Sequence, residues 1–228
     1  MKKHATIAVS VTLALIFTAA AVMSYNSLSG DRSASVSGQN AKASAAAEKK
    51  DLGPVVGLYP TPLVVVGTMV DGKPNWMLAG HNGNIGHDRI MLSLAKAHYT
   101  NRGIRETKAV SVNVVDEALL EKADYVGSVS GAKTDKSQVF AYSLGENGAP
   151  LIDEAKVTME CSVADIYETD KFDNFILSVG HTYAAADILN ENGRIDYNKF
   201  KPVLFEMPNY TYLRTGDTIA KCLTLGKK

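Results

Sequence analysis

Two short apolar strands joined by an Asp-Gly turn constrain the fold of this chain more than any other feature. Residues 63–70 form a run rich in β-branched side chains, which favour extended backbone. Asp71 and Gly72 follow, and this pair supplies the positive φ angles of a tight hairpin. Residues 75–80 form the return strand. The sequence therefore predicts an antiparallel hairpin at the start of a sheet.

Two polar corners follow the hairpin, each at the end of a strand. The first corner, residues 81–88, is rich in Gly and Asn. A strand over residues 89–94 leads to the second corner, residues 95–100, and a short helical pattern then runs to Thr107. Residues 109–115 form the next strand. Small residues, free backbone N–H groups and a few cations at neighbouring corners suit an anionic cofactor that lies across a sheet.

The rest of the chain is also dominated by strand patterns. An amphipathic helix is predicted over residues 116–126. Long strands are predicted over residues 155–167 and 174–186, a short one over 203–207 and a last one over 217–225. Turns are frequent and no internal repeat is visible. This pattern indicates a mainly β fold with peripheral helices, in which a closed or split antiparallel barrel is the best arrangement.

The amino terminus predicts export. Residues 1–23 combine a cationic start with an apolar run, which is typical of a signal peptide, and an uncleaved N-terminal membrane anchor is the alternative. Either reading places the rest outside the cytoplasm, exported to the periplasm or medium or anchored facing outward. Residues 24–51 have the composition of a flexible linker. The ordered domain is expected over residues 52–228.

Charge and cysteine content exclude some classes of partner. The 24 basic and 24 acidic residues balance, and no basic stripe exists to neutralise the phosphates of a nucleic acid. Cys161 and Cys222 both fall in predicted strands, where they can form one disulfide or remain two buried thiols. Neither these cysteines nor His81 and His87 have the neighbours that would complete a metal site.

Three segments together carry a resemblance to a known family. The first is the hairpin at residues 72–75, and the second is residues 92–100. The third comprises residues 130–136 with residues 150–161. In order and spacing these segments resemble the flavin reductase-like FMN-binding split barrels, a family that includes flavoredoxin. The resemblance covers essentially the whole chain after Leu52.

The resemblance implies a fold, a cofactor and an activity. Members of the family form a six-stranded split β-barrel, are usually homodimers and hold FMN non-covalently near the subunit interface. Many of them pass hydride from NADH or NADPH to the flavin. The implied function is therefore an FMN-binding oxidoreductase of flavin reductase type, with NAD(P)H or a redox protein as electron donor.

The resemblance also implies positions for the cofactor contacts. The first corner would lie along the isoalloxazine, and the second would border the ribityl chain and the phosphate. Further contacts would come from the start of the helix and from a second cation. The implied FMN-binding residues are Met77, Leu78, Ala79, Gly80, His81, Asn82, Ser93, Leu94, Ala95, Lys96, Thr100 and Lys136.

The sequence departs from the family pattern at four positions. Leu78 stands where many relatives have a hydroxyl residue, and His81 stands where an aromatic residue is common. Ala132 replaces a usual Arg, although Lys133 follows it. Asn174 occupies a position where relatives often carry His.

Several candidate residues also have a purely structural explanation. Lys96 and Thr100 can be phosphate ligands at a helix start or ordinary surface residues. A solvated loop explains His98 as well as a ligand role does. Trp76 alternates with apolar neighbours, which favours a place in the core or at an interface over a role as cofactor platform.

Three functions remain open on the sequence alone. The first is the flavin reductase-type oxidoreductase, for which no side chain is identified as catalytic acid or base. The second is an exported FMN electron-transfer protein without a nicotinamide site, because nicotinamide cofactors are cytosolic. The third is a barrel that has lost its cofactor and serves as a binding module.

Overall fold

The computed structural model describes residues 47–227, and the unit that begins at Pro54 contains all the helices and strands below. The predicted leader and most of the predicted linker, up to residue 46, lie outside the described residues. Within residues 47–227, none of the helices is sufficiently long and apolar to span a bilayer.

The strands are β1 Thr61–Pro62, β2 Val64–Val70, β3 Lys73–Ala79, β4 Asn82–Asn84, β5 Arg89–Ala95, β6 Ala109–Val114, β7 Tyr142–Leu144, β8 Pro150–Ile152, β9 Val157–Glu168, β10 Phe172–Ala184, β11 Val203–Glu206 and β12 Thr211–Arg214. The helices are α2 Thr100–Thr107, α3 Leu120–Ser128 and a 3-10 turn at Ala186–Ile188.

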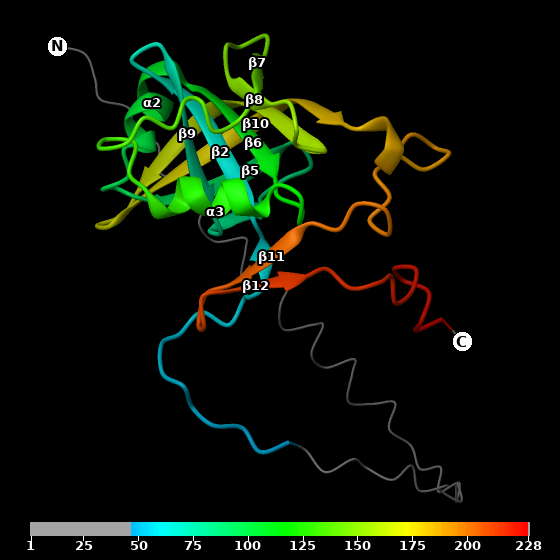
Figure 1. The fold of residues 1–228 in the computed structure, drawn as a ribbon. Coiled ribbons are helices and arrows are strands. Elements are labelled where there is room, and N and C mark those ends of the chain that lie inside the picture. Colours follow the sequence, from blue (N-terminus) through cyan, green and yellow to red (C-terminus); the bar gives the residue numbers. More distant parts are fainter. Residues whose placement is uncertain (1–46, 228) are drawn as a thin grey trace, which may run out of the picture. The chain divides into compact units, whose positions relative to one another are not determined.

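A seven-stranded antiparallel sheet forms most of the domain. Its strand order is β3-β2-β6-β9-β10-β5-β4, and it curls into a half-barrel with α2 and α3 outside it (Figure 1). The two edge strands, β3 and β4, are separated in sequence only by Gly80 and His81. The opening of the barrel therefore lies at this dipeptide. The predicted fold class, a mainly β split barrel with peripheral helices, is confirmed.

The predicted hairpin is present and its turn has the expected backbone. Asp71 and Gly72 have φ angles of 49° and 76°, and Val70 pairs with Lys73 across the turn. The return strand starts earlier than predicted, at Lys73, and includes Pro74. Proline is tolerated there because β3 is an edge strand whose outer side needs no ladder hydrogen bond.

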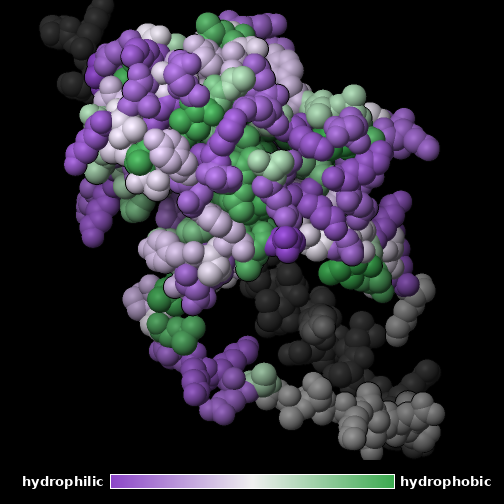
Figure 2. Space-filling view, in the orientation of Figure 1, coloured by the Kyte–Doolittle hydropathy of each residue, from purple (hydrophilic) through white to green (hydrophobic). Residues whose placement is uncertain are grey.

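Strand β2 is buried on both faces, which explains its continuous run of β-branched residues. Val64 and Val66 belong to the cluster inside the barrel, together with Phe175. Val65 points the other way, into a second cluster that α3 covers from outside and that includes Trp76. Trp76 is completely buried, so the core interpretation of this residue is correct. Polar side chains cover most of the domain face seen in Figure 2.

The predicted carboxyl-terminal strand is wrong. Residues 217–225 are irregular in the structure, and Ile219 is 96% exposed because no neighbouring strand pairs with this segment. The last strand is instead β12, which pairs with β11 from Val203↔Arg214 to Glu206↔Thr211 and forms a small sheet with β1. Apolar and polar residues alternate over residues 217–225 as they do in a strand, but no other strand that the structure describes pairs with this segment.

Three other predictions need correction. Cys161 is buried as expected, but Cys222 lies exposed in the irregular tail, and both thiols are free. The amphipathic helix predicted over residues 116–126 starts at Leu120 rather than at Asp116, because residues 116–119 form a turn in which the Asp116 carboxylate accepts a hydrogen bond from the Leu119 N–H at 3.0 Å. Part of the first polar corner is strand β4, which pairs with β5.

Candidate functional site

The two polar corners lie side by side at the opening of the barrel. The backbone N–H of Ser93 donates to the carbonyl of His81 at 2.9 Å, and Asn82 pairs with Leu92. The ladder between β4 and β5 therefore joins the first corner to the strand that leads to the second. This proximity is the arrangement that a ligand spanning both corners requires.

A cavity of about 430 Å³, here called the corner cavity, lies beside this opening. Both corners contribute to its wall, the first through His81 and the second through His98, and Gly80 lines it just before the first corner. The end of α3 contributes Gly127 and Ser128. Leu78 and the aromatic residues of the β11–β12 hairpin complete the lining. The volume lies in the range of small-molecule and cofactor sites, roughly 300–1,000 Å³.

Two glycines in the wall allow close approaches that a side chain would block. A Cβ atom on Gly80 would lie 2.5 Å from the Phe205 ring, and one on Gly127 would lie 2.8 Å from the Cβ of Leu78. Glycine at these positions lets β11 pack over the barrel opening and lets α3 pack against β3. The glycines therefore set the width of the corner cavity.

Lys136 is a buried cation that lines a separate cavity of about 360 Å³, together with Asn75 and Tyr99. The residue is only 4% exposed. Its ammonium donates hydrogen bonds to the carbonyl oxygens of Val126 at 3.0 Å and Val129 at 3.1 Å, at the carboxyl end of α3. Burial lowers the pKa of Lys136 to about 8. Within the described residues it forms no ion pair with a carboxylate. An ammonium has three donors, so one remains for a ligand.

His98 lies close enough to Lys136 for the ammonium charge to affect its pKa. Desolvation is the larger cause that lowers the pKa of His98, and repulsion by Lys136 is the second. Two cationic or potentially cationic groups therefore lie near each other at the second corner. The one carboxylate of the corner cavity, Asp124, is engaged by the Tyr212 hydroxyl at 2.5 Å. This distribution of charge favours an anionic group beside Lys136 and His98.

A match between the sequence and a protein-family model identifies the family of this chain. The family model described as "Flavin reductase like domain" matches residues 56–213, more than half of the chain. The chain belongs to the flavin reductase-like family. The family predicted from the three sequence segments is therefore confirmed.

Solved structures agree with this assignment. Flavoredoxin from Methanosarcina acetivorans is 33% identical, with 79% of this chain and 98% of that chain covered and a TM-score of 0.76. Flavoredoxin of Desulfovibrio vulgaris (Miyazaki F) is also 33% identical, with 79% and 100% covered and a TM-score of 0.73. An FMN-binding protein from Thermus thermophilus, at 22% identity, 77% and 99% coverage and a TM-score of 0.66, is similar in fold.

A curated relative shows similarity over part of its length. An uncharacterized protein from Aeropyrum pernix is 26% identical over 161 residues, which are 65% of this chain. The chain spans 58% of the length of that protein.

The corner cavity fits a flavin of this family. Its lining combines apolar and aromatic side chains, among them Leu78, Phe205 and Tyr210, which suit a flat ring. Nearby, the buried Lys136 offers a positive charge without a carboxylate partner in the described residues. Three of the predicted flavin-binding residues, Leu78, Gly80 and His81, line the corner cavity directly. Lys136 does not line the corner cavity; it lines the separate cavity and lies near His98.

Other predicted residues lie elsewhere. The side chains of Met77, Ala79 and Leu94 belong to the cluster inside the barrel, so they are not available to a ligand at the corners. Thr100 is buried and its hydroxyl accepts a hydrogen bond from Asn75 at 2.8 Å. Thr100 therefore takes part in an internal polar contact at the start of α2.

The remaining predicted residues surround the edge of β5. Ala95 is half-buried, and Lys96 is exposed and pairs with Glu168 at 3.2 Å. Asn82 and Ser93 line a second, neighbouring cavity. Lys96 lines neither cavity, so the structure does not bring it together with Leu78, Gly80 and His81.

Sequence reasoning missed several lining residues. The sequence does not decide whether His98 is a ligand or a solvated loop residue, and the structure places it in the lining of the corner cavity. Gly127 and Ser128 lie just after the predicted end of the amphipathic helix, where two small residues precede a polar loop. Tyr210 and Tyr212 line the cavity because β12 pairs with β11, a pairing that the sequence pattern did not predict.

Two polar contacts hold strand β12 in place beside the corner cavity. The Tyr212 hydroxyl donates to Asp124 of α3, and the Arg214 guanidinium makes a bidentate contact with Glu117 at 2.7 and 2.9 Å. Burial and the hydrogen bond to Asp124, in that order, raise the pKa of Tyr212 to about 12. The hairpin thus closes one side of the cavity.

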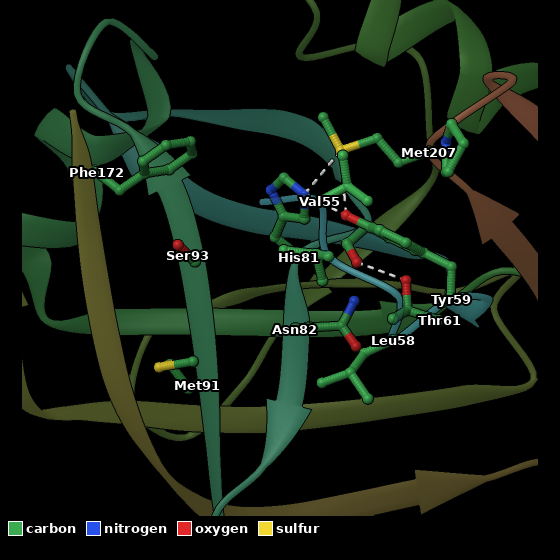
Figure 3. A pocket seen from close by; sticks show the side chains of 13 residues that line it. Val55, Leu58, Tyr59, Thr61, His81, Asn82, Met91, Ser93, Phe172 and Met207 are labelled. Atoms are coloured by element: carbon green, nitrogen blue, oxygen red, sulfur yellow. Dashed lines mark hydrogen bonds between the residues drawn. The ribbon is translucent and has the colours of Figure 1, made fainter. Parts of the chain in front are cut away.

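The second cavity, here called the apolar cavity, has a volume of about 640 Å³ (Figure 3). It shares Gly80, His81 and Met207 with the corner cavity. At this shared wall the Tyr59 hydroxyl lies 2.9 Å from His81 Nε2 and 3.1 Å from the sulfur of Met207. The Gly80-His81 backbone therefore separates two adjoining cavities of different character.

Proposed function

We propose that the protein binds FMN non-covalently in the corner cavity and acts as an oxidoreductase of flavin reductase type. The observation that carries this proposal is the buried Lys136, which has no carboxylate partner in the described residues and lies near His98. A phosphate monoester supplies the missing negative charge. Two flavoredoxins at 33% identity, and the FMN-binding protein of similar fold, support FMN as the flavin.

The residues of the cavity then have distinct roles. Lys136 and His98 hold the phosphate. Gly80 and His81 border the flat ring, and Phe205, which packs directly against Gly80, forms the neighbouring part of the wall. Leu78 covers the ring with apolar surface. The flavin supplies the hydride chemistry when it is bound, and the protein contributes position and electrostatic environment.

NAD(P)H is the proposed electron donor, and a second candidate is an electron carrier without a nicotinamide site. The second candidate is favoured by one observation: among the residues that line the apolar cavity beside the flavin site, none is Lys or Arg, although a dinucleotide carries two phosphates. Export, which residues 1–23 predict, also favours a redox-protein donor. We propose a homodimer in either case.

Two measurements test these proposals. Titration of the purified domain with FMN, followed by flavin absorbance and fluorescence, is expected to give stoichiometric binding, and a protein that takes up no FMN would contradict the proposal. Anaerobic mixing of the FMN-loaded protein with NADH or NADPH then separates the two candidates. Bleaching of the flavin absorbance within seconds supports the reductase, and an unchanged spectrum that dithionite bleaches supports the carrier.

A further inference from the structure

The apolar cavity has the lining of a ligand site rather than of a gap between elements. Thirteen residues line it, and none is Lys, Arg, Asp or Glu (Figure 3). Val55, Val56 and Leu58 form one wall from the segment before β1, and Met91 and Phe172 form the opposite wall. The first three side chains are 64%, 64% and 83% exposed, so a neutral ligand would remove a large apolar area from water.

Two polar groups interrupt this apolar surface. One is the hydrogen-bonded pair of the Tyr59 hydroxyl and the His81 ring, which are 2.9 Å apart. The other is Ser93, whose hydroxyl forms no hydrogen bond with another part of the chain that the structure describes. The Asn82 amide is already engaged by the carbonyl of Pro62 at 2.9 Å. The available polar groups therefore suit a ligand with few hydrogen-bonding atoms.

The charge of the lining excludes several ligand classes. A nucleotide, a dinucleotide or a sugar phosphate needs cations or a helix amino terminus for its phosphates. The apolar cavity offers neither; His98 lines the corner cavity, and Lys136 lines a third cavity. The aromatic rings of Tyr59 and Phe172 flank His81, with centroids 6.4 and 6.1 Å from the imidazole centroid. Aromatic walls and apolar side chains suit a flat, uncharged ring system.

We propose that the apolar cavity binds a neutral aromatic carbonyl compound of the quinone class, as the electron acceptor of this protein. The inference rests on the proposed function, because it needs a flavin in the adjoining corner cavity. A quinone is flat and uncharged, its few polar atoms are carbonyl acceptors, and the Tyr59 hydroxyl is a donor at the wall that both cavities share. The ligand would lie against Gly80-His81, on the other side of this dipeptide from the flavin site.

The reduction of a quinone at this site can be written so that its electrons and protons balance. Conversion of a quinone to a hydroquinone requires two electrons and two protons. The two electrons cross the Gly80-His81 backbone from the reduced flavin, which would release one proton to water as it returns to its oxidised form. Of the two protons that the quinone takes up, one comes from the Tyr59 hydroxyl, which regains it through its hydrogen bond with His81, and the other comes from water. Tyr59 and His81 are thus placed to serve both recognition and proton supply.

Binding to the oxidised, FMN-loaded protein tests the proposal without turnover. The probe is menadione, 2-methyl-1,4-naphthoquinone, titrated by calorimetry, and the charged comparison is 1,2-naphthoquinone-4-sulfonate. We expect saturable binding of menadione and at least tenfold weaker binding of the sulfonate. Menadione that does not bind, or a sulfonate that binds equally well, would overturn the proposal. FMN uptake is measured separately, so its failure identifies a fault in the proposed function instead.

A variant pair locates the binding site. Val56→Asp places a carboxylate in the wall of the apolar cavity at a side chain that is 64% exposed, and Leu144→Asp makes the same change at a residue that is 60% exposed and lines neither cavity. Val56→Asp should weaken menadione binding at least tenfold and leave FMN binding unchanged. Leu144→Asp should alter neither. Equal menadione affinity in the two variants would place the quinone elsewhere and overturn the proposal.

Discussion

The ammonium of Lys136 lies 3.0 Å from the carbonyl oxygen of Val126, in the last turn of α3. A helix end carries partial negative charge, which stabilises a cation there without neutralising it. The burial of Lys136 therefore leaves a positive charge near His98 for a ligand to neutralise.

Replacement of Lys136 should weaken FMN binding. Lys136→Met keeps the length of the side chain and removes the charge, and the lost charge-assisted contact should cost about 1–3 kcal/mol of binding free energy. Fluorescence titration of FMN measures the effect. Lys133→Met is the control, because Lys133 is exposed and lies in the same loop. Equal losses in the two variants would show only a general effect of positive charge.

Lys96→Ala should change FMN affinity far less than Lys136→Met. Lys96 is exposed, pairs with Glu168 at 3.2 Å and lines neither cavity. An exposed ion pair of this kind contributes little, about 0–1 kcal/mol, to stability. The same titration measures the difference. A loss as large as that of Lys136→Met would return Lys96 to the phosphate site that the family resemblance implies.

FMN affinity should fall as the pH rises above about 8. Burial lowers the pKa of Lys136 to about 8 in the free protein, so its ammonium loses its proton in this range. An anionic ligand favours the protonated form and raises the pKa, which means that binding takes up a proton above pH 8 and weakens with each further step. Titrations between pH 7 and 9.5 measure this slope. Lys136→Met should lack it, and an unchanged slope in that variant would assign the pH dependence to another group.

The same pKa has the opposite effect on the stability of the free protein. The unfolded chain has a Lys pKa of 10.5, so between about pH 8 and 10.5 the unfolded state binds more protons at this residue than the folded state does. The contribution of Lys136 to the free energy of unfolding therefore rises with pH across this window. Denaturant melts of the free protein and of Lys136→Met, compared at pH 7.5 and 9.5, isolate that contribution. A difference between the two proteins that does not change with pH would contradict it.

The sequence predicted the parts of the site that depend on local pattern. The Asp71-Gly72 turn and the two corners follow from turn chemistry and apolar runs, and the structure brings the corners together because β4 pairs with β5. Lys136 depends on a contact between a loop and the end of a helix, so its burial was not visible in the sequence. The family resemblance alone pointed to it.

The parts that failed depend on pairing between distant segments. Apolar alternation suggested a strand over residues 217–225, but no strand lies beside it, and Tyr212 reaches the corner cavity because Thr211–Arg214 pairs with β11 instead. A strand is defined by its partner, and a single sequence records its own alternation but not its partner. The aromatic wall of the cavity was therefore outside the reach of pattern analysis.

Gly80→Ala should destabilise the protein and impair FMN uptake. The added Cβ would lie 2.5 Å from the Phe205 ring, so β11 must move away from the barrel opening, at a cost of about 1–3 kcal/mol. Denaturant unfolding and FMN titration measure the two effects. Gly83→Ala is a matched control three residues later, where an added Cβ meets nothing within 4 Å. If both variants unfold alike, the cost comes from the loss of glycine flexibility and not from the contact with Phe205.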